Sequence, residues 1–472
     1  MNKRKELVKN TLIIGLGKVS TQMISFFLLP LYTFFLSPSE YGVVDLVITY
    51  VALLVPAITI QLEMASFRFL IDARNDENEK RRVISNVMQL VLPIMVVSAI
   101  LFGLIALILH VPYALLIVLL IAITIFSNLF LQFARGLGDN KKFAIGSIAT
   151  GVTTLVASIV FVAVLKWGAE GLLASLALSN LVGATYLFIS LKLWRYIGIA
   201  NPDKALKRKL VNYSLPLVPN GVAWWVINVS DRTIITLFLG AAANGIYAVS
   251  NKYAAIFSSI FSIFSMSWTE SASVHIDAKD RDKFFSETTN AVIRLFGSFG
   301  VMLIVAIPLV FSLLVNEQFN ESYLYIPILI VSAFFNAVVG MYSAVYVAKK
   351  MTKQVMNTSL ASAGINIVLT VVLIPFLGIF AAALSTAIAF LAMAIFRHYD
   401  LKKYVKITFE RGLFWKIAAL YAFAMTLYYF NTIPGNIANA VIITAIVLVF
   451  NRSVVKVLRN KIFDTVRRSP QV

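Results

Sequence analysis

Long apolar runs recur along the whole chain, and they constrain its fold more than any other feature. The sequence has 472 residues, of which 60% are hydrophobic and 13% are charged, whereas a soluble domain carries about 25% charged residues. About 20 apolar residues suffice for a helix to cross a bilayer, whereas membrane β-barrel strands alternate in polarity over about 10 residues. The sequence therefore predicts an all-α polytopic membrane protein.

Hydropathy and turn residues together predict about fourteen transmembrane helices. Turn signals such as Ser37-Pro38-Ser39 and Pro434-Gly435 separate neighbouring spans. We expect the spans near residues 11–36, 43–70, 83–109, 112–134, 143–165, 170–191, 213–239, 245–270, 288–315, 325–348, 357–376, 378–396, 413–431 and 436–451.

Positive charge is distributed unevenly between the predicted loops. With both termini placed in the cytoplasm, the inner segments hold 34 of the 41 Lys and Arg residues, and the outer loops hold Lys166. Cytoplasmic loops of membrane proteins are enriched in these residues. Topology thus accounts for the net charge of +19, and we expect no nucleic-acid partner.

The sequence offers little material for enzymatic or metal chemistry. It contains no cysteine, which excludes disulfides, thiolate nucleophiles and Cys-ligated metals. Its histidines, His110, His275 and His398, are scattered near span ends. The longest predicted outer loop, around Asn316–Leu324, has only about ten residues. We therefore expect no metal site, no cofactor and no enzymatic activity.

A weak internal repeat relates the two halves of the chain. A shift of 203 residues places Leu36-Ser37 on Leu239-Gly240 and Gly42-Val43 on Gly245-Ile246. We therefore expect two pseudo-symmetric six-helix lobes, residues 1–200 and 201–400, followed by a helix pair and basic tail in 401–472. Both repeats start in the cytoplasm, as in transporters built from parallel repeats.

Four charged residues lie deep within predicted spans: Lys18 in the first, Asp231 and Arg232 in the seventh, and Lys252 in the eighth. A charge at this depth costs roughly 2.5–3.5 kcal/mol, so such residues usually face protein or water. If Asp231 neutralises one cation, the remainder forms a positive cavity that suits a phosphate group. Alternatively, these charges pair with one another and specify helix packing.

Three further ionisable residues lie in the second predicted span. Glu63 is a candidate proton or counter-ion site. Arg68 lies nearer the cytoplasm and either faces the cavity or extends to the interface. Asp45, near the outer end, has no assigned role at this level.

Two segments resemble a known family. LVKNTLIIGLGKVSTQMISFFLLPLYTFFLSPSEYGVVDL and DRTIITLFLGAAANGIYAVSNKYA resemble Wzx-type polysaccharide-export flippases of the multidrug/oligosaccharidyl-lipid/polysaccharide (MOP) superfamily. The resemblance implies a two-lobed, MATE-like bundle in the bacterial cytoplasmic membrane. It would translocate undecaprenyl-diphosphate-linked oligosaccharide by alternating access, for capsule, O-antigen or exopolysaccharide synthesis. It also implies that Lys18, Arg232 and Lys252 are cavity cations, with Arg68 a further candidate.

The resemblance leaves two alternatives and several partners open. The last two predicted spans resemble those of lipid II flippases, which keeps peptidoglycan precursor as an alternative cargo. A multidrug or cation antiporter of the same fold would need an anionic site, whereas the deep charges are mostly basic. The expected partners are the lipid-linked oligosaccharide and membrane lipid, with a polysaccharide polymerase as a candidate protein partner.

Overall fold

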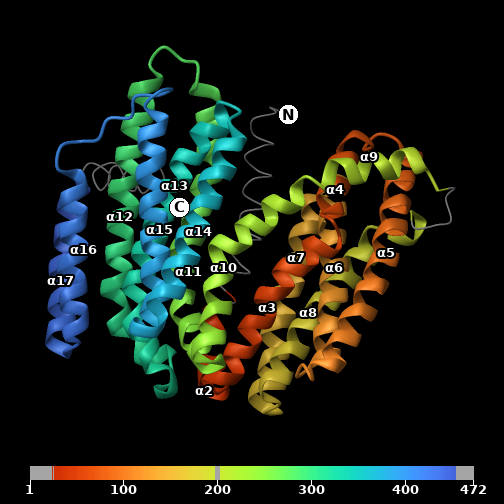
Figure 1. Cartoon of the computed structure of the whole chain (residues 1–472), viewed down its shortest axis with the longest axis horizontal. Helices are drawn as coiled ribbons and strands as arrows, with labels where there is room; N and C mark the ends of the chain where they lie inside the picture. Colours follow the sequence, from red (N-terminus) through yellow and green to blue (C-terminus); the bar gives the residue numbers. More distant parts are fainter. Residues whose placement is uncertain (1–23, 25, 197–201, 453–472) are drawn as a thin grey trace, which may run out of the picture. The chain divides into compact units, whose positions relative to one another are not determined.

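The computed structural model describes residue 24, residues 26–196 and residues 202–452. Helices make up most of this part of the chain, and no β-strand occurs in it (Figure 1). The predicted all-α fold is therefore confirmed.

The helices follow one another with short connections. In the first part of the chain they are α2 (Leu29–Phe35), α3 (Pro38–Ile58), α4 (Leu62–Asp72), α5 (Glu77–Ile108), α6 (Ala114–Gly136), α7 (Asn140–Ser158), η1 (Ile159–Val164), α8 (Gly168–Ser190), η2 (Leu193–Arg195) and α9 (Lys204–Ser214). In the second part they are α10 (Leu217–Leu239), α11 (Ala241–His275), α12 (Arg281–Leu314), η3 (Glu317–Tyr325), α13 (Ile326–Ala348), α14 (Thr352–Leu377), α15 (Ile379–Leu401), α16 (Leu413–Phe430) and α17 (Ile433–Phe450).

The helices agree well with the predicted spans. Within the described residues, eleven helical segments are long and apolar enough to cross a membrane. The helices α10 and α11 also coincide with predicted spans, 213–239 and 245–270. Most of the first predicted span, 11–36, lies outside the described residues. The protein is thus a multi-pass membrane protein, and the exact number of fourteen spans stays a prediction.

The second predicted span, 43–70, is not one helix. It is divided into α3 and α4 by a turn at residues 59–61, where Ile60 and Gln61 have φ angles of 51° and 53°. Left-handed backbone is unfavourable for residues other than glycine, so the surrounding structure must hold it. Gln61 contributes to this, because its Nε2 donates a hydrogen bond to the Leu217 carbonyl of α10 at 3.0 Å.

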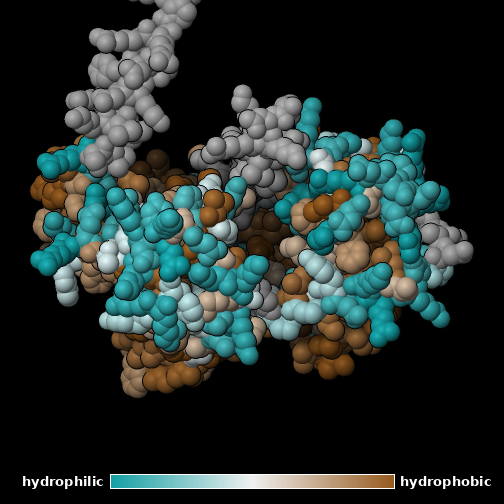
Figure 2. Space-filling model, turned by 90° about the horizontal axis from the view of Figure 1, so that it is seen from above, coloured by the Kyte–Doolittle hydropathy of each residue, from teal (hydrophilic) through white to brown (hydrophobic). Residues whose placement is uncertain are grey.

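The chain divides into two compact units. Unit 1 contains residues 1–252 and 359–379, and unit 2 contains residues 253–358 and 380–472. These boundaries differ from the predicted lobes 1–200 and 201–400, whose assignment stays a prediction. Hydrophilic residues cover much of the end of the molecule seen in Figure 2, and hydrophobic residues lie along its sides. This distribution fits helices surrounded by lipid.

Small residues allow close helix packing in unit 1. The helix α8 packs against α6 and α7, and α4 packs against α6. A Cβ atom on Gly183 of α8 would lie 2.1 Å from Oγ1 of Thr150 in α7, and one on Gly136 of α6 would lie 2.7 Å from Cβ of Leu70 in α4. Glycine thus brings these backbones together, as is common in membrane helices.

The C-terminal pair α16–α17 packs against α12 in unit 2 (Figure 1). On α12, Gly300 leaves room for the Tyr421 side chain of α16, whose Oη would lie 2.0 Å from an added Cβ. The rings of Tyr323 and Tyr428 stack with centroids 4.1 Å apart. At the other end of the pair, Asn451 Nδ2 donates to Ser298 Oγ at 2.8 Å. The pair is therefore an integral part of unit 2.

A reciprocal glycine contact joins the start of α3 to the start of α11 in unit 1. A Cβ on Gly42 would lie 1.8 Å from the carbonyl oxygen of Ala241, and one on Gly245 would lie 1.9 Å from that of Pro38. Asn244 Nδ2 donates to the Gly42 carbonyl at 2.8 Å. Both contact pairs are related by the 203-residue shift, so equivalent positions of the repeat meet each other here.

Replacing either glycine of this contact by alanine should destabilise the protein. Because the added Cβ would collide with backbone, Gly42→Ala or Gly245→Ala should cost about 1–3 kcal/mol, measured as a lower midpoint of thermal unfolding in detergent. Gly103→Ala is the matched control, because nothing lies within 4 Å of a Cβ there. Equal midpoints for all three variants would contradict the packing described.

Candidate functional site

A cluster of charged residues lies where α3 meets α10 and the start of α11, within unit 1. On α3, Asp45 is 10% exposed at its side chain, and Arg232 of α10 is 21% exposed. Arg232 Nε lies 3.4 Å from Asp45 Oδ2. Its Nη1 also donates to Thr49 Oγ1 at 3.1 Å. The guanidinium is therefore held by two groups of α3, and this pair joins α3 to α10.

Asp231 accepts hydrogen bonds from both α11 and α10. The Tyr247 hydroxyl of α11 donates to Asp231 Oδ2. The backbone N–H of Arg232 donates to Asp231 Oδ1 at 3.0 Å. Both Asp231 and Tyr247 are buried. The role of Asp231 as a counter-ion stays a prediction. The structure adds Asp45 as the carboxylate whose side chain forms an ion pair with Arg232.

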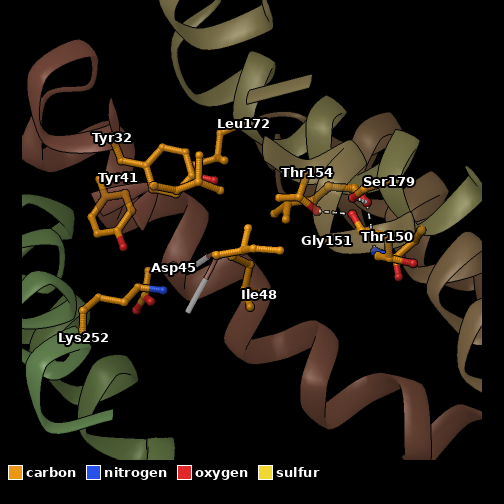
Figure 3. A pocket seen from close by; sticks show the side chains of 14 residues that line it. Tyr32, Tyr41, Asp45, Ile48, Thr150, Gly151, Thr154, Leu172, Ser179 and Lys252 are labelled. Carbon is orange, nitrogen blue, oxygen red and sulfur yellow. Dashed lines mark hydrogen bonds between the residues drawn. The ribbon is translucent and has the colours of Figure 1, made fainter. Parts of the chain in front are cut away.

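Lys252 faces a cavity of about 240 Å³ in unit 1. Its side chain points toward Asp45, and Tyr32 and Tyr41 lie on the same side of the pocket (Figure 3). The rings of these two tyrosines lie 5.9 Å apart between centroids. The cavity thus has one ionic end, formed by Lys252 and Asp45.

The charge balance of this cluster differs from the expectation. The sequence predicts two cations in spans 7 and 8, Arg232 and Lys252, against one anion, Asp231. The described cluster contains Asp45 as a second anion. Sequence reasoning missed this role because Asp45 lies 187 positions before Arg232. Only the internal repeat indicates that Asp45 lies near α11. It aligns Gly42 with Gly245, and these two glycines form the contact between the starts of α3 and α11.

The remaining candidates lie elsewhere. Lys18 lies outside the described residues. Glu63 is buried at the start of α4, where Thr59 Oγ1 donates to its Oε2 at 2.7 Å. Arg68 is 47% exposed and forms an ion pair with Asp72 at 2.7 Å on the same helix. The structure therefore brings Arg232, Lys252 and Asp231 together, and places Glu63 and Arg68 in other surroundings.

Trp225 supports the cluster from α10. Its Nε1 donates to the Thr49 carbonyl of α3 at 2.8 Å, and its ring lies 5.8 Å from that of Tyr50 between centroids. A buried indole usually needs such a partner for its N–H. Trp225 therefore packs α10 against α3 beside the Arg232–Thr49 contact. No group of His, Asp and Glu in the described part of the chain could hold a metal ion.

The cluster lies within the part of the chain that matches a protein-family model. The family model described as "Polysaccharide biosynthesis protein" matches residues 7–269, which include Asp45, Arg232 and Lys252. A comparison with curated protein sequences gives no match. The predicted resemblance is thus confirmed by a model that spans more than half of the chain.

Solved structures show the same fold. A lipid II flippase MurJ in an inward closed conformation is 16% identical, with a TM-score of 0.65 over 95% of this chain and 100% of that one. An inward-facing multidrug resistance MATE family transporter of the MOP superfamily is 12% identical, with a TM-score of 0.66 over 86% and 98%. A MOP superfamily transporter from Pyrococcus furiosus is 14% identical, with a TM-score of 0.56 over 84% and 96%. The predicted MATE-like fold is therefore confirmed.

Breaking the Arg232–Asp45 pair should destabilise the protein. Removing one partner of a mostly buried ion pair leaves an uncompensated charge. We expect Asp45→Asn or Arg232→Gln to cost about 2–3 kcal/mol in the free energy of unfolding, and the double variant to cost less than the sum of the two. Arg68→Gln, which breaks an exposed pair, should change nothing measurable. Additive effects in this cycle, measured by SDS-induced unfolding, would contradict a direct pair.

Proposed function

Because the chain belongs to the polysaccharide biosynthesis protein family, we propose that it is a flippase for undecaprenyl-diphosphate-linked oligosaccharide. It would move this substrate across the bacterial cytoplasmic membrane by alternating access, for capsule, O-antigen or exopolysaccharide synthesis. Both termini would lie in the cytoplasm. The observation that carries the proposal is Lys252 at a membrane-embedded cavity, with Arg232 close by in the same cluster.

Lys252 and Arg232 have complementary chemistry for a diphosphate. The Lys ammonium is a compact charge with three donors, and the Arg guanidinium offers a fork that matches two phosphate oxygens. Without substrate, Asp45 balances the guanidinium at 3.4 Å. An entering diphosphate would compete with this carboxylate for the same cations. In this proposal Asp45 therefore keeps the cations in place, and it also weakens the binding of the anion.

Lys18 and Arg68 would serve the substrate at other stages of transport. Lys18 would be a cavity cation of the first span, and Arg68 would meet the headgroup near the cytoplasmic interface. The exposure of Arg68 and its contact with Asp72 favour such a peripheral role. A polysaccharide polymerase would receive the product at the outer leaflet.

Lipid II is the second candidate cargo. The C-terminal pair α16–α17 favours it, because the last two spans resemble those of lipid II flippases. The structural likeness to a lipid II flippase also extends over 95% of this chain. Lipid II and the oligosaccharide lipid share a polyprenyl diphosphate, so the proposed roles of Lys252 and Arg232 are the same for both.

A cation antiporter is a third candidate, favoured by one observation. Asp45, Tyr32 and Tyr41 line the same cavity as Lys252, and a carboxylate with aromatic rings can bind an organic cation. An anionic and a cationic substrate make opposite predictions for the roles of Lys252 and Asp45. An anionic substrate needs Lys252 and is repelled by Asp45, whereas a cationic substrate needs Asp45.

Substitution of these two residues should separate the candidates. For an anionic substrate, Lys252→Ala should weaken binding of undecaprenyl diphosphate about 10- to 100-fold, the loss of a charge-assisted hydrogen bond. Asp45→Asn should leave this affinity unchanged or raise it. Arg294→Gln, which removes an exposed ion pair with Glu410 in unit 2, is the control. Binding of tetraphenylphosphonium that depends on Asp45 instead would contradict the flippase proposal.

Glu63 should couple transport to a proton gradient. Its carboxylate is buried next to the turn between α3 and α4, with Thr59 as donor. Glu63→Gln should therefore retain binding of undecaprenyl diphosphate but remove the dependence of transport on the pH gradient in proteoliposomes. Thr426→Val, at an exposed position of α16 whose hydroxyl bonds only within its own helix, is a polar-to-apolar control away from this turn. Transport by Glu63→Gln that still responds to the gradient would exclude proton coupling at this residue.

A further inference from the structure

We propose that unit 1 contains a binding site for the first sugars of the substrate, next to the ionic end of the cavity. The site is a trough lined by uncharged polar side chains of α6, α7 and α8. This inference rests on the proposed function, because it gives the saccharide of the lipid-linked substrate a place of its own. The polar residues of the trough are Thr124, Asn128, Thr150, Thr154, Ser179 and Asn180.

The trough consists of two adjoining cavities. The first, of about 240 Å³, contains Lys252 and Asp45 at one side and the polar residues of α7 and α8 at the other (Figure 3). The second, of about 290 Å³, is lined by α3, α6 and α8. Ile48, Leu176 and Asn180 line both cavities. Their joint size falls within the range of about 300–1,000 Å³ that is typical of small-molecule sites.

The hydrogen bonds inside the trough determine what it can bind. Thr150 Oγ1 donates to the Gly146 carbonyl at 3.0 Å, and Thr154 Oγ1 donates to the Thr150 carbonyl at 2.9 Å. On α8, Ser179 Oγ and Asn180 Nδ2 both donate to the Leu176 carbonyl, at 3.0 and 2.9 Å. Each hydroxyl has one proton, and here that proton is already used. These hydroxyls therefore offer lone pairs to a ligand.

Hydroxyls whose protons are already used, such as that of Thr154, favour a ligand that can donate hydrogen bonds. Sugar hydroxyls can donate to the lone pairs of Thr154 and to the amide oxygen of Asn180, which are both partly exposed. Ionised phosphate oxygens only accept, so they find no donors among the back-bonded hydroxyls and find them instead at Lys252 and Arg232. The chemistry thus divides the cavity, with the diphosphate at the ionic end and the saccharide in the trough.

Two further features fit a saccharide. Leu172, Leu176 and Ile48 give the trough an apolar floor, against which the C–H faces of a pyranose ring can pack. Asn128 lies on α6, is exposed, and makes no hydrogen bond within the described part of the chain. An exposed amide on a membrane helix needs water or a polar ligand. Its amide would give the α6 side of the trough both a donor and an acceptor.

The proposal is tested by binding two probes to the purified protein in lipid nanodiscs. The probes are undecaprenyl diphosphate and undecaprenyl-diphosphate-linked N-acetylglucosamine. The sugar replaces one ionisable oxygen of the terminal phosphate, so tighter binding of the glycosylated probe cannot come from added negative charge. The wild type should bind the glycosylated probe more tightly. Each of Thr154→Val, Asn180→Leu and Asn128→Leu should weaken it about three- to tenfold, the effect of one lost hydrogen bond. Affinity for the bare diphosphate should not change.

Thr185→Val is the matched control, because Thr185 is an exposed residue of α8 that lines neither cavity. Because Asn128 is exposed, Asn128→Leu should fold normally, so a loss of binding in this variant is not explained by misfolding. The proposal is overturned if the wild type binds both probes equally, or if the trough variants lower both affinities together or neither. Failure of the proposed function looks different: Lys252→Ala then leaves binding of the bare diphosphate unchanged.

Discussion

The ion pair between Arg232 and Asp45 is the contact on which the rest of the candidate site depends. A charge in a membrane span is costly unless it meets a partner or water, and this pair meets that need at 3.4 Å. Thr49 reinforces it by accepting from the guanidinium and from Trp225. Together with the Gly42–Gly245 contact, these interactions hold α3 against α10 and the start of α11. Lys252 thereby comes to lie beside Asp45 at the same end of the cavity.

Most of the helices could be predicted from the sequence, because an apolar run long enough to cross a bilayer has few other stable structures in lipid. The turn at 59–61 could not. Hydropathy is averaged over about 19 residues, and Thr59, Ile60 and Gln61 interrupt the run too briefly to register. The left-handed backbone there depends on a distant contact, the hydrogen bond from Gln61 to Leu217.

The sequence was enough to select the cations of the cluster as candidates, but not to identify the groups that pair with them. Arg232 and Lys252 could be identified because a charge deep in a membrane span has a high free-energy cost. Their partners depend on tertiary packing, because Asp231 also accepts from Tyr247 of α11 and Asp45 comes from α3. The neutral trough left no signal in the sequence, because Ser, Thr and Asn are common in membrane helices. Only the shared cavities and the direction of the hydrogen bonds distinguish it.

An experimental structure of the protein in a nanodisc with bound undecaprenyl-diphosphate-linked saccharide would show directly whether these cations hold the substrate. We expect the diphosphate within hydrogen-bond distance of Lys252 Nζ and the Arg232 guanidinium, with Asp45 displaced from its present contact. A diphosphate bound elsewhere, with the 3.4 Å Arg232–Asp45 pair intact, would contradict it.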